Sequence, residues 1–145
     1  MGPIVLAIDD DRSSQILMRA HLEDEQFCSQ FVDKSNGIDA LSYLNDIAQN
    51  SNQQIFPDIV LLDIHMPEMS GWEFLEEITP ILKSLDIKPL IILLSATNTA
   101  EDVELAVKHT AVFDITTKPI TNEYLDSLKN KTEPRKFFLD ECKCA

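Results

Sequence analysis

Glycine and cysteine are scarce in this sequence, which has 3 of each among its 145 residues. So few glycines exclude collagen-like repeats and glycine-rich linkers. The cysteines are odd in number and lack the spacing of a secreted disulfide framework: Cys28, Cys142 and Cys144. The last two form a C-x-C pair without a nearby histidine or further cysteine, which is too few ligands for a structural zinc site. We therefore expect free thiols.

Long hydrophobic runs are also missing. The longest near the start covers residues 4–8, which is too short for a signal peptide or a membrane span. Basic residues are few as well, with 12 Lys and Arg against 25 Asp and Glu and a formal net charge of -13. A negative field of this kind repels nucleic acids and anionic membranes and favours partners with basic faces. We expect a cytoplasmic protein that binds neither nucleic acid nor membrane.

The sequence alternates between two kinds of segment. Short apolar runs rich in β-branched residues predict buried strands, a weak one at residues 30–32 and clearer ones at 4–8, 59–62, 90–94 and 112–115. Between and after these runs, apolar residues recur with the period of a helix. Ser13 is a candidate N-cap for the first helix, and Asn98 or Thr99 for the fourth. Pro80 lies inside the third helical pattern and predicts a kink or a break there.

Five strand–helix repeats predict an α/β fold with helices on both faces of a parallel sheet. Five strands suit the doubly wound order 2-1-3-4-5 of the flavodoxin-like (βα)5 arrangement. We expect this domain to span residues 1–131 and residues 132–145 to form a short tail. Because the tail contains an apolar Phe137-Phe138-Leu139 patch, we favour its docking on the domain or on a partner over disorder.

Polar residues follow four of the five predicted strands. In parallel α/β sheets the carboxyl ends of the strands meet at one edge, and functional residues gather there. The residues are Asp9, Asp10 and Asp11 after the first strand, Asp63 after the third, Ser95 after the fourth and Lys118 after the fifth. Taken singly, each has an ordinary explanation as a helix cap, a turn residue or a solvated side chain, and we give Asp11 no other role. Complementary groups at four strand ends are much harder to explain by coincidence.

Each residue type at this edge has a chemical use. Clustered carboxylates repel one another, and a divalent cation such as Mg²⁺, which prefers oxygen ligands, removes that penalty. A carboxylate is also a nucleophile toward phosphoryl groups, and Asp63 is our candidate. Lys118 would offer a positive charge, and Ser95 a hydroxyl donor, to the oxygens of the transferred group.

These residues resemble the receiver domains of two-component response regulators, over roughly residues 4–128. The D-x-x-M-P-x-x-x-G run is highly specific where it follows an apolar strand. The resemblance rests on the aspartates after Ile8, on that run from Asp63 to Gly71, on Leu94-Ser95-Ala96 and on Thr117-Lys118-Pro119.

The resemblance implies an acceptor and a Mg²⁺ site. Asp63 matches the phosphoacceptor and also a metal ligand. Asp10 matches the direct metal ligand, and Asp9 the carboxylate that reaches the metal mainly through water. The backbone carbonyl of His65 matches the third protein ligand. The side chains of His65 and Thr97 stand where residues of the family set the lifetime of the phosphoryl-aspartate.

The resemblance also implies a switch. Ser95 matches the hydroxyl that moves toward the phosphoryl group, and Lys118 matches the lysine that pairs with it. The Lys118–Pro119 peptide bond is expected to be cis, as in the family. The switch aromatic three residues before the lysine is replaced by Ile115, so coupling through a rotating ring cannot operate as usual.

The resemblance implies a signalling protein, not an enzyme that acts on separate substrates. A sensor histidine kinase or a histidine phosphotransfer protein would donate the phosphoryl group to Asp63. The chain would then signal through contact with a downstream protein, or pass the group onward.

Three alternatives remain open. A degenerate receiver that acts only as a binding module is favoured by Ile115 and opposed by the complete set of site residues. An aspartate-nucleophile phosphohydrolase of the haloacid dehalogenase type would need an acidic residue two positions after Asp63, where His65 stands. A flavodoxin-like electron carrier would need a hydroxyl- and glycine-rich phosphate loop after the first strand, where three aspartates stand.

Overall fold

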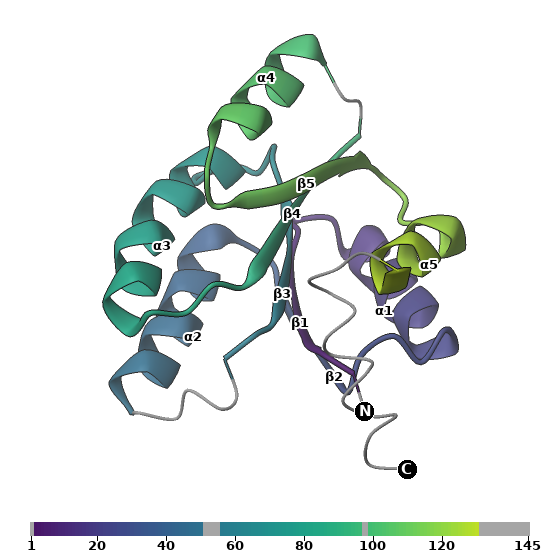
Figure 1. Cartoon of the computed structure of the whole chain (residues 1–145), viewed down its shortest axis with the longest axis horizontal. Helices are drawn as coiled ribbons and strands as arrows, with labels where there is room; N and C mark the ends of the chain where they lie inside the picture. The colour runs from purple at the N-terminus through teal and green to yellow at the C-terminus, as the bar shows by residue number, and fades with distance from the viewer. Residues whose placement is uncertain (1, 51–55, 97–98, 131–145) are drawn as a thin grey trace.

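The computed structural model describes residues 2–50, 56–96 and 99–130. In this part of the chain strands and helices alternate (Figure 1). The strands are β1 (Ile4–Ile8), β2 (Gln30–Lys34), β3 (Ile59–Asp63), β4 (Leu90–Ser95) and β5 (Val112–Thr117). The helices are α1 (Arg12–Asp24), α2 (Gly37–Gln49), α3 (Gly71–Leu85), α4 (Ala100–Lys108) and α5 (Asn122–Asn130).

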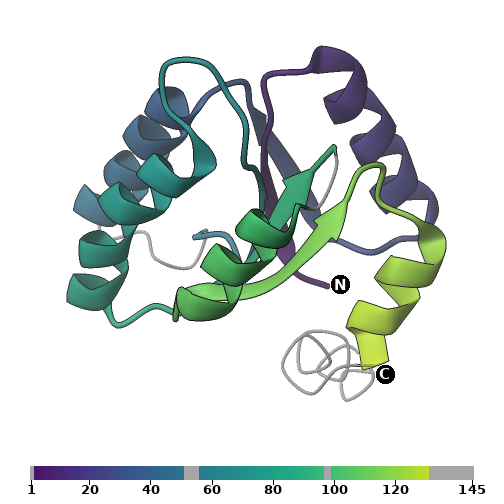
Figure 2. The ribbon, with the colours of Figure 1, turned by 90° about the horizontal axis from the view of Figure 1, so that it is seen from above.

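The strands form one parallel sheet in the order β2-β1-β3-β4-β5, which confirms the predicted fold class. Helices cover both faces of the sheet (Figure 2). The core on one face includes side chains of α1 and α5, and the core on the other includes side chains of α2, α3 and α4. Because both faces are covered, every residue of β3 and β4 is buried. This burial explains why these two strands are continuous apolar runs in the sequence.

Helix starts are fixed by side chains that accept hydrogen bonds from free N–H groups. In the capping box of α3, the Ser70 hydroxyl accepts from the N–H of Glu73, and the Glu73 carboxylate accepts from the N–H of Ser70. Thr99 caps α4, as predicted. The prediction for α1 is wrong: its N-cap is Asp11, whose carboxylate accepts a hydrogen bond from the N–H of Ser13.

The break predicted at Pro80 does not occur, because α3 continues through it from Gly71 to Leu85. A proline inside a helix removes one backbone hydrogen bond. Ile78 and Leu82 are both buried against the sheet. This packing on either side of Pro80 holds the helix in place despite the missing bond.

Several predictions fall on residues that the structure does not describe. These are the domain boundary at residue 131, the tail at 132–145 with its apolar patch, and the thiols of Cys142 and Cys144. Cys28 is a free and partly buried thiol. Among the described helices, none combines the length and the hydrophobicity that crossing a bilayer requires.

Candidate functional site

The register of the parallel strands brings the predicted site residues to one edge of the sheet. Ile8 of β1 pairs with Leu62 of β3, so Asp9, which follows β1, and Asp63, the last residue of β3, lie side by side. Asp63 in turn pairs with Leu94 of β4, directly before Ser95. All of these residues therefore stand at the carboxyl ends of neighbouring strands.

Three aspartates cluster at this edge. Each of Asp9, Asp10 and Asp63 offers a carboxylate oxygen, and these oxygens all lie within 4.8 Å of one another. Asp9 is 1% exposed and Asp63 is 4% exposed, whereas Asp10 is open to solvent. Burial, aided by the charge of Asp9 and opposed by that of Lys118, raises the pKa of Asp63 to about 6. The metal-free cluster is therefore electrostatically strained.

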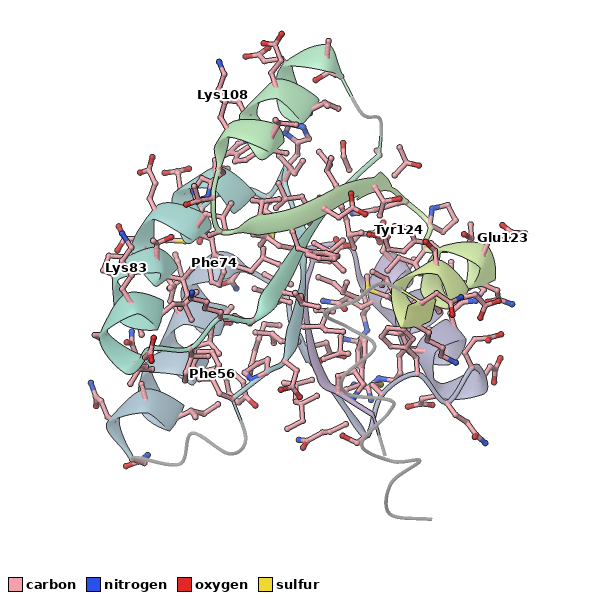
Figure 3. All side chains as sticks on the ribbon, in the orientation of Figure 1. Phe56, Phe74, Lys83, Lys108, Glu123 and Tyr124 are labelled. Carbon is pink, nitrogen blue, oxygen red and sulfur yellow. The ribbon has the colours of Figure 1, made fainter. Side chains whose placement is uncertain are left out.

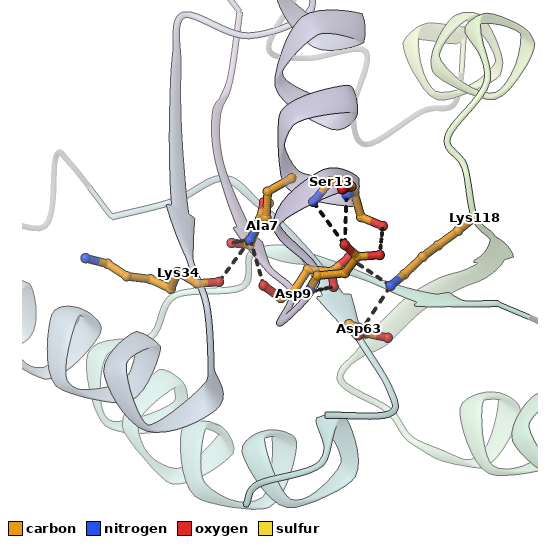
Figure 4. Close-up of polar contacts among 9 residues, drawn as sticks. Ala7, Asp9, Ser13, Lys34, Asp63 and Lys118 are labelled. Atoms are coloured by element: carbon orange, nitrogen blue, oxygen red, sulfur yellow. Dashed lines mark hydrogen bonds and ion pairs between the residues drawn. The ribbon is translucent and has the colours of Figure 1, made fainter. Parts of the chain in front are cut away.

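The ammonium group of Lys118 partly relieves this strain. Its Nζ lies 2.8 Å from Oδ2 of Asp9 and 3.3 Å from Oδ2 of Asp63 (Figure 4). Desolvation lowers the pKa of Lys118, but the two carboxylates more than offset it, so this pKa lies above its ordinary value. The Lys118–Pro119 peptide bond is cis, as predicted.

Ser95 lies at the end of β4 and is fully buried. Its carbonyl accepts a hydrogen bond of 2.8 Å from the backbone N–H of Lys118. Ser95 also pairs with Thr117 in the ladder between β4 and β5. These two contacts with Ser95 fix the end of β5, and therefore the start of the Lys118 side chain, beside the end of β4.

The His65 side chain contacts α4. The imidazole is 68% exposed, and its Nε2 lies 3.4 Å from Oδ2 of Asp102, a buried residue in the first turn of that helix. The prediction that the backbone carbonyl of His65 binds a cation stays a prediction. Thr97, the other residue predicted to set the phosphoryl lifetime, lies outside the described residues. Ile115 packs partly buried against the core that includes α2 and α3.

Gly71 allows α3 to begin directly against the end of β3. A Cβ atom at this position would lie 2.7 Å from the carbonyl oxygen of Asp63 and 2.9 Å from Cα of Ile64. The N–H of Gly71 donates to the carbonyl of Ile64 at 2.8 Å. Any side chain here would push the backbone of Asp63 or α3 out of place.

Two residues beside the site are not among those predicted from the sequence. Asp102 gave no signal, because its partner His65 is distant along the chain. Gln15 shares the buried face of α1 with Met18 and Leu22, and its Nε2 lies 3.2 Å from the carbonyl oxygen of Asp9. A polar residue on an otherwise apolar helical face was the signal that could have identified it.

The aspartate cluster has the chemistry of a Mg²⁺ site. Its donors are all carboxylate oxygens, the ligands that this cation prefers, and one of the three residues is open to water. Oδ2 of Asp9 is buried and receives no well-aligned hydrogen bond, although it is ion-paired with Lys118. The three aspartates therefore fit a small hard cation that keeps part of its water shell.

Comparison with known proteins gives the same family as the sequence motifs around Asp63 and Lys118. The family described as the response regulator receiver domain matches residues 5–129. A protein-glutamate methylesterase/protein-glutamine glutaminase of Agrobacterium fabrum is 33% identical over 79% of this chain and 29% of its own length. A two-component response regulator of Arabidopsis thaliana is 32% identical over 88% of this chain and 21% of its own length. The chain thus spans less than a third of these curated relatives.

Solved structures agree with the fold. A two-component response regulator from Cytophaga hutchinsonii superposes with a TM-score of 0.79 at 26% identity, covering 88% of this chain and 93% of that one. A CheY-like receiver domain protein from Methanospirillum hungatei gives a TM-score of 0.63 at 26% identity, covering 94% of each chain. Together with the family match over almost the whole described chain, these comparisons show that the chain belongs to the receiver domains of two-component response regulators.

Proposed function

We propose that this receiver, which we assign to residues 1–131, is a phosphorylation-controlled switch in which Asp63 accepts a phosphoryl group. The observation that carries the proposal is the convergence of Asp63 with two further carboxylates and one ammonium group at a single strand edge. We expect a sensor histidine kinase or a histidine phosphotransfer protein to be the donor. A sensor histidine kinase of Helicobacter pylori is one of the relatives, 28% identical over 89% of this chain and 15% of its own length.

In the proposed reaction, a carboxylate oxygen of Asp63 attacks phosphorus. The P–N bond of the phosphohistidine breaks, the imidazole leaves with the bonding electrons, and an aspartyl phosphate remains. Asp63 reacts in its ionised form, which burial disfavours and which a bound cation would stabilise. Lys118, already 3.3 Å from Asp63, is placed to pair with an oxygen of the transferred group.

Asp9, Asp10 and Asp63 would hold Mg²⁺, with the carbonyl of His65 as a further candidate ligand. When bound, the cation would neutralise charge on the carboxylates and on the phosphoryl oxygens. Asp9 and Asp10 would hold the cation and would not themselves react with the phosphoryl group.

The donor has room to approach beside Lys118. A cleft of about 400 Å³ is lined by Ser14, Leu17 and His21 of α1 and by Pro119 and Ile120 after β5. Leu17 is 55% exposed. An apolar rim next to a charged centre suits a protein partner that carries the phosphohistidine.

We place this chain in the cytoplasm and expect it to signal through a downstream protein or to pass the phosphoryl group onward. The new charge on Asp63 would attract Lys118 and the hydroxyl of Ser95. With Ile115 at the position of the switch aromatic, no ring there can report the movement. We therefore expect the response to run through Ser95 and Lys118, whose backbones are joined by a hydrogen bond of 2.8 Å.

The test is the intact mass of the protein after incubation with Mg²⁺ and acetyl phosphate. We expect one added phosphoryl group in the wild type and none in Asp63→Asn. Chelation of Mg²⁺ should abolish the adduct. Asp58→Asn is the matched control, because Asp58 precedes β3 and bonds to the backbone N–H of Ile4, away from the site.

Beryllium fluoride, an analogue of the phosphoryl group, covers the case of an adduct that hydrolyses too fast to be seen. A wild type that forms no adduct and binds no beryllium fluoride would overturn the proposal and support the degenerate receiver. Sustained turnover of a small phosphate ester would support the phosphohydrolase instead.

A further inference from the structure

Gln15 is a buried polar residue of α1 that contacts the backbone of Asp9. It is 7% exposed. Its Nε2 lies 3.2 Å from the carbonyl oxygen of Ala7, 3.2 Å from that of Asp9 and 3.0 Å from that of Lys34. One side chain of α1 thus joins the carboxyl ends of β1 and β2.

The oxygen atom of the Gln15 amide indicates that this position needs the hydrogen-bond donors of the amide nitrogen. Its Oε1 is buried and accepts no hydrogen bond in the described part of the chain. A buried polar atom without a partner costs free energy. An apolar side chain, like the neighbouring Met18 and Leu22 on the same face, would avoid that cost. A purely space-filling role therefore does not account for a glutamine here.

Together with the contacts of Gln15, backbone hydrogen bonds and an ion pair hold Asp9 on several sides. The N–H of Asp9 donates to the carbonyl of Lys34 at 3.1 Å, and that same carbonyl faces Gln15. Oδ1 of Asp9 accepts from the N–H of Asp11 at 2.9 Å, and Oδ2 faces Lys118 at 2.8 Å. The backbone and the carboxylate of Asp9 are therefore both fixed, and Gln15 is the side chain that fixes the carbonyl.

We propose that Gln15 is a positioning residue for Mg²⁺: by holding the carbonyl of Asp9, it sets the direction in which Asp9 and Asp10 present their carboxylates. The inference rests on the proposed function, since it assumes that these aspartates hold the cation. Residues that orient metal ligands typically change metal affinity about 10- to 100-fold when they are replaced. Because Gln15 acts through the backbone of one ligand, we expect the lower end of that range.

The experiment is a Mg²⁺ titration of the wild type, Gln15→Met and Leu22→Ala, followed by the fluorescence of Trp72, the single tryptophan, and by calorimetry. Gln15→Met keeps the length and bulk of the side chain but removes its donors. Leu22 lies on the same buried face of α1, so Leu22→Ala perturbs that helix without touching the carbonyls. Urea unfolding of each protein in chelator measures the stability of the apo form.

We expect Gln15→Met to bind Mg²⁺ about tenfold more weakly than the wild type, and Leu22→Ala to bind it as the wild type does despite its lower stability. If Gln15→Met does not fold, Gln15→Asn replaces it, because its shorter amide cannot span the three carbonyls and should give the same weakening.

The outcomes separate the two proposals. If the wild type binds Mg²⁺ and the Gln15 variant binds it within twofold of the wild type, Gln15 is only a structural cap and this inference fails alone. If Leu22→Ala weakens binding as much as the Gln15 variant does, helix stability explains the effect, and the inference also fails. If the wild type binds no Mg²⁺, the proposed function fails and takes the inference with it.

Discussion

α3 and α4 both follow strands that end at the aspartate cluster, but they are attached to the sheet very differently. α3 has 15 residues, begins with a capping box and buries Gly71, Phe74, Leu75, Ile78 and Leu82. α4 has 9 residues and buries only Asp102 and Ala106. Its Val107 is 80% exposed.

From this difference we expect α3 to form the fixed side of the site and α4 the movable side. α3 packs against the end of β3, where Gly71 brings its backbone against Asp63. α4 has little buried apolar surface to lose, and elements of this kind have low local stability. We therefore expect Asp63 to be held on the side of α3, and a change in charge at the site to displace α4 at small cost.

The largest expected effect comes from loosening the fixed side. Phe74, 1% exposed, lies on the side of α3 that faces the sheet (Figure 3). Phe74→Ala should lower the free energy of unfolding by about 4 kcal/mol, because it leaves a cavity in the core. Val107→Ala in α4 should change it by less than about 0.5 kcal/mol. Urea unfolding of both variants measures these two changes. Similar losses of unfolding free energy would contradict the difference between α3 and α4.

Asp63→Asn should stabilise the protein in chelator at pH 8 by about 3 kcal/mol. Burial raises the pKa of Asp63 from 3.8 to about 6, so the folded state holds this proton more tightly than the unfolded state does. Wild-type stability is therefore lost as the pH rises through that interval, at about 1.4 kcal/mol for each pKa unit. The gain from Asp63→Asn should be small near pH 4, because the folded state holds the proton and the unfolded carboxyl, with a pKa of 3.8, releases it only in part.

Urea unfolding in chelator across this pH range measures the effect of Asp63→Asn. Saturating Mg²⁺ should stabilise the wild type more than the variant, which lacks one of the three carboxylates. If Asp63→Asn raised the free energy of unfolding by the same amount at pH 4 and pH 8, folding would not raise the pKa of Asp63.

The smallest effect is expected on the movable side. Asp102→Asn weakens the contact with His65, and because His65 is largely exposed the loss should be at most about 1 kcal/mol. Hydrogen exchange is the sharper measurement: amides of α4 should exchange faster, and amides of α3 should not. Glu101→Gln removes the same charge from the same helical turn without touching His65, and serves as the control. Equal acceleration by both variants would assign the effect to charge alone.

The strand order and the aspartate cluster followed from the sequence because both depend on simple regularities. Strands buried on both faces are continuous apolar runs, as in β3 and β4. The carboxyl ends of parallel strands share one edge, so Asp9 and Asp63 were expected to meet, and the clustering of their carboxylates shows that they do.

The rest depended on contacts that no local pattern encodes. Asp11 and Ser13 are both good N-cap residues two positions apart, and only the path of the chain after β1 selects Asp11. The cost of Pro80 in α3 is offset by the packing of that helix on the sheet. Gln15 acts on three backbone carbonyls, which leave no mark in the sequence.

Lys118 is in effect a tethered counterion. It belongs to the chain, so its charge remains beside Asp9 and Asp63 at any ionic strength and when divalent cations are removed. The carboxylates are therefore never left wholly without compensation, and their mutual repulsion is limited before any cation binds. If Mg²⁺ binds there, as we propose, it enters beside an ammonium group that already neutralises part of the charge. We therefore expect Lys118 to lower the affinity of the site for the cation and to keep the carboxylates in position without it.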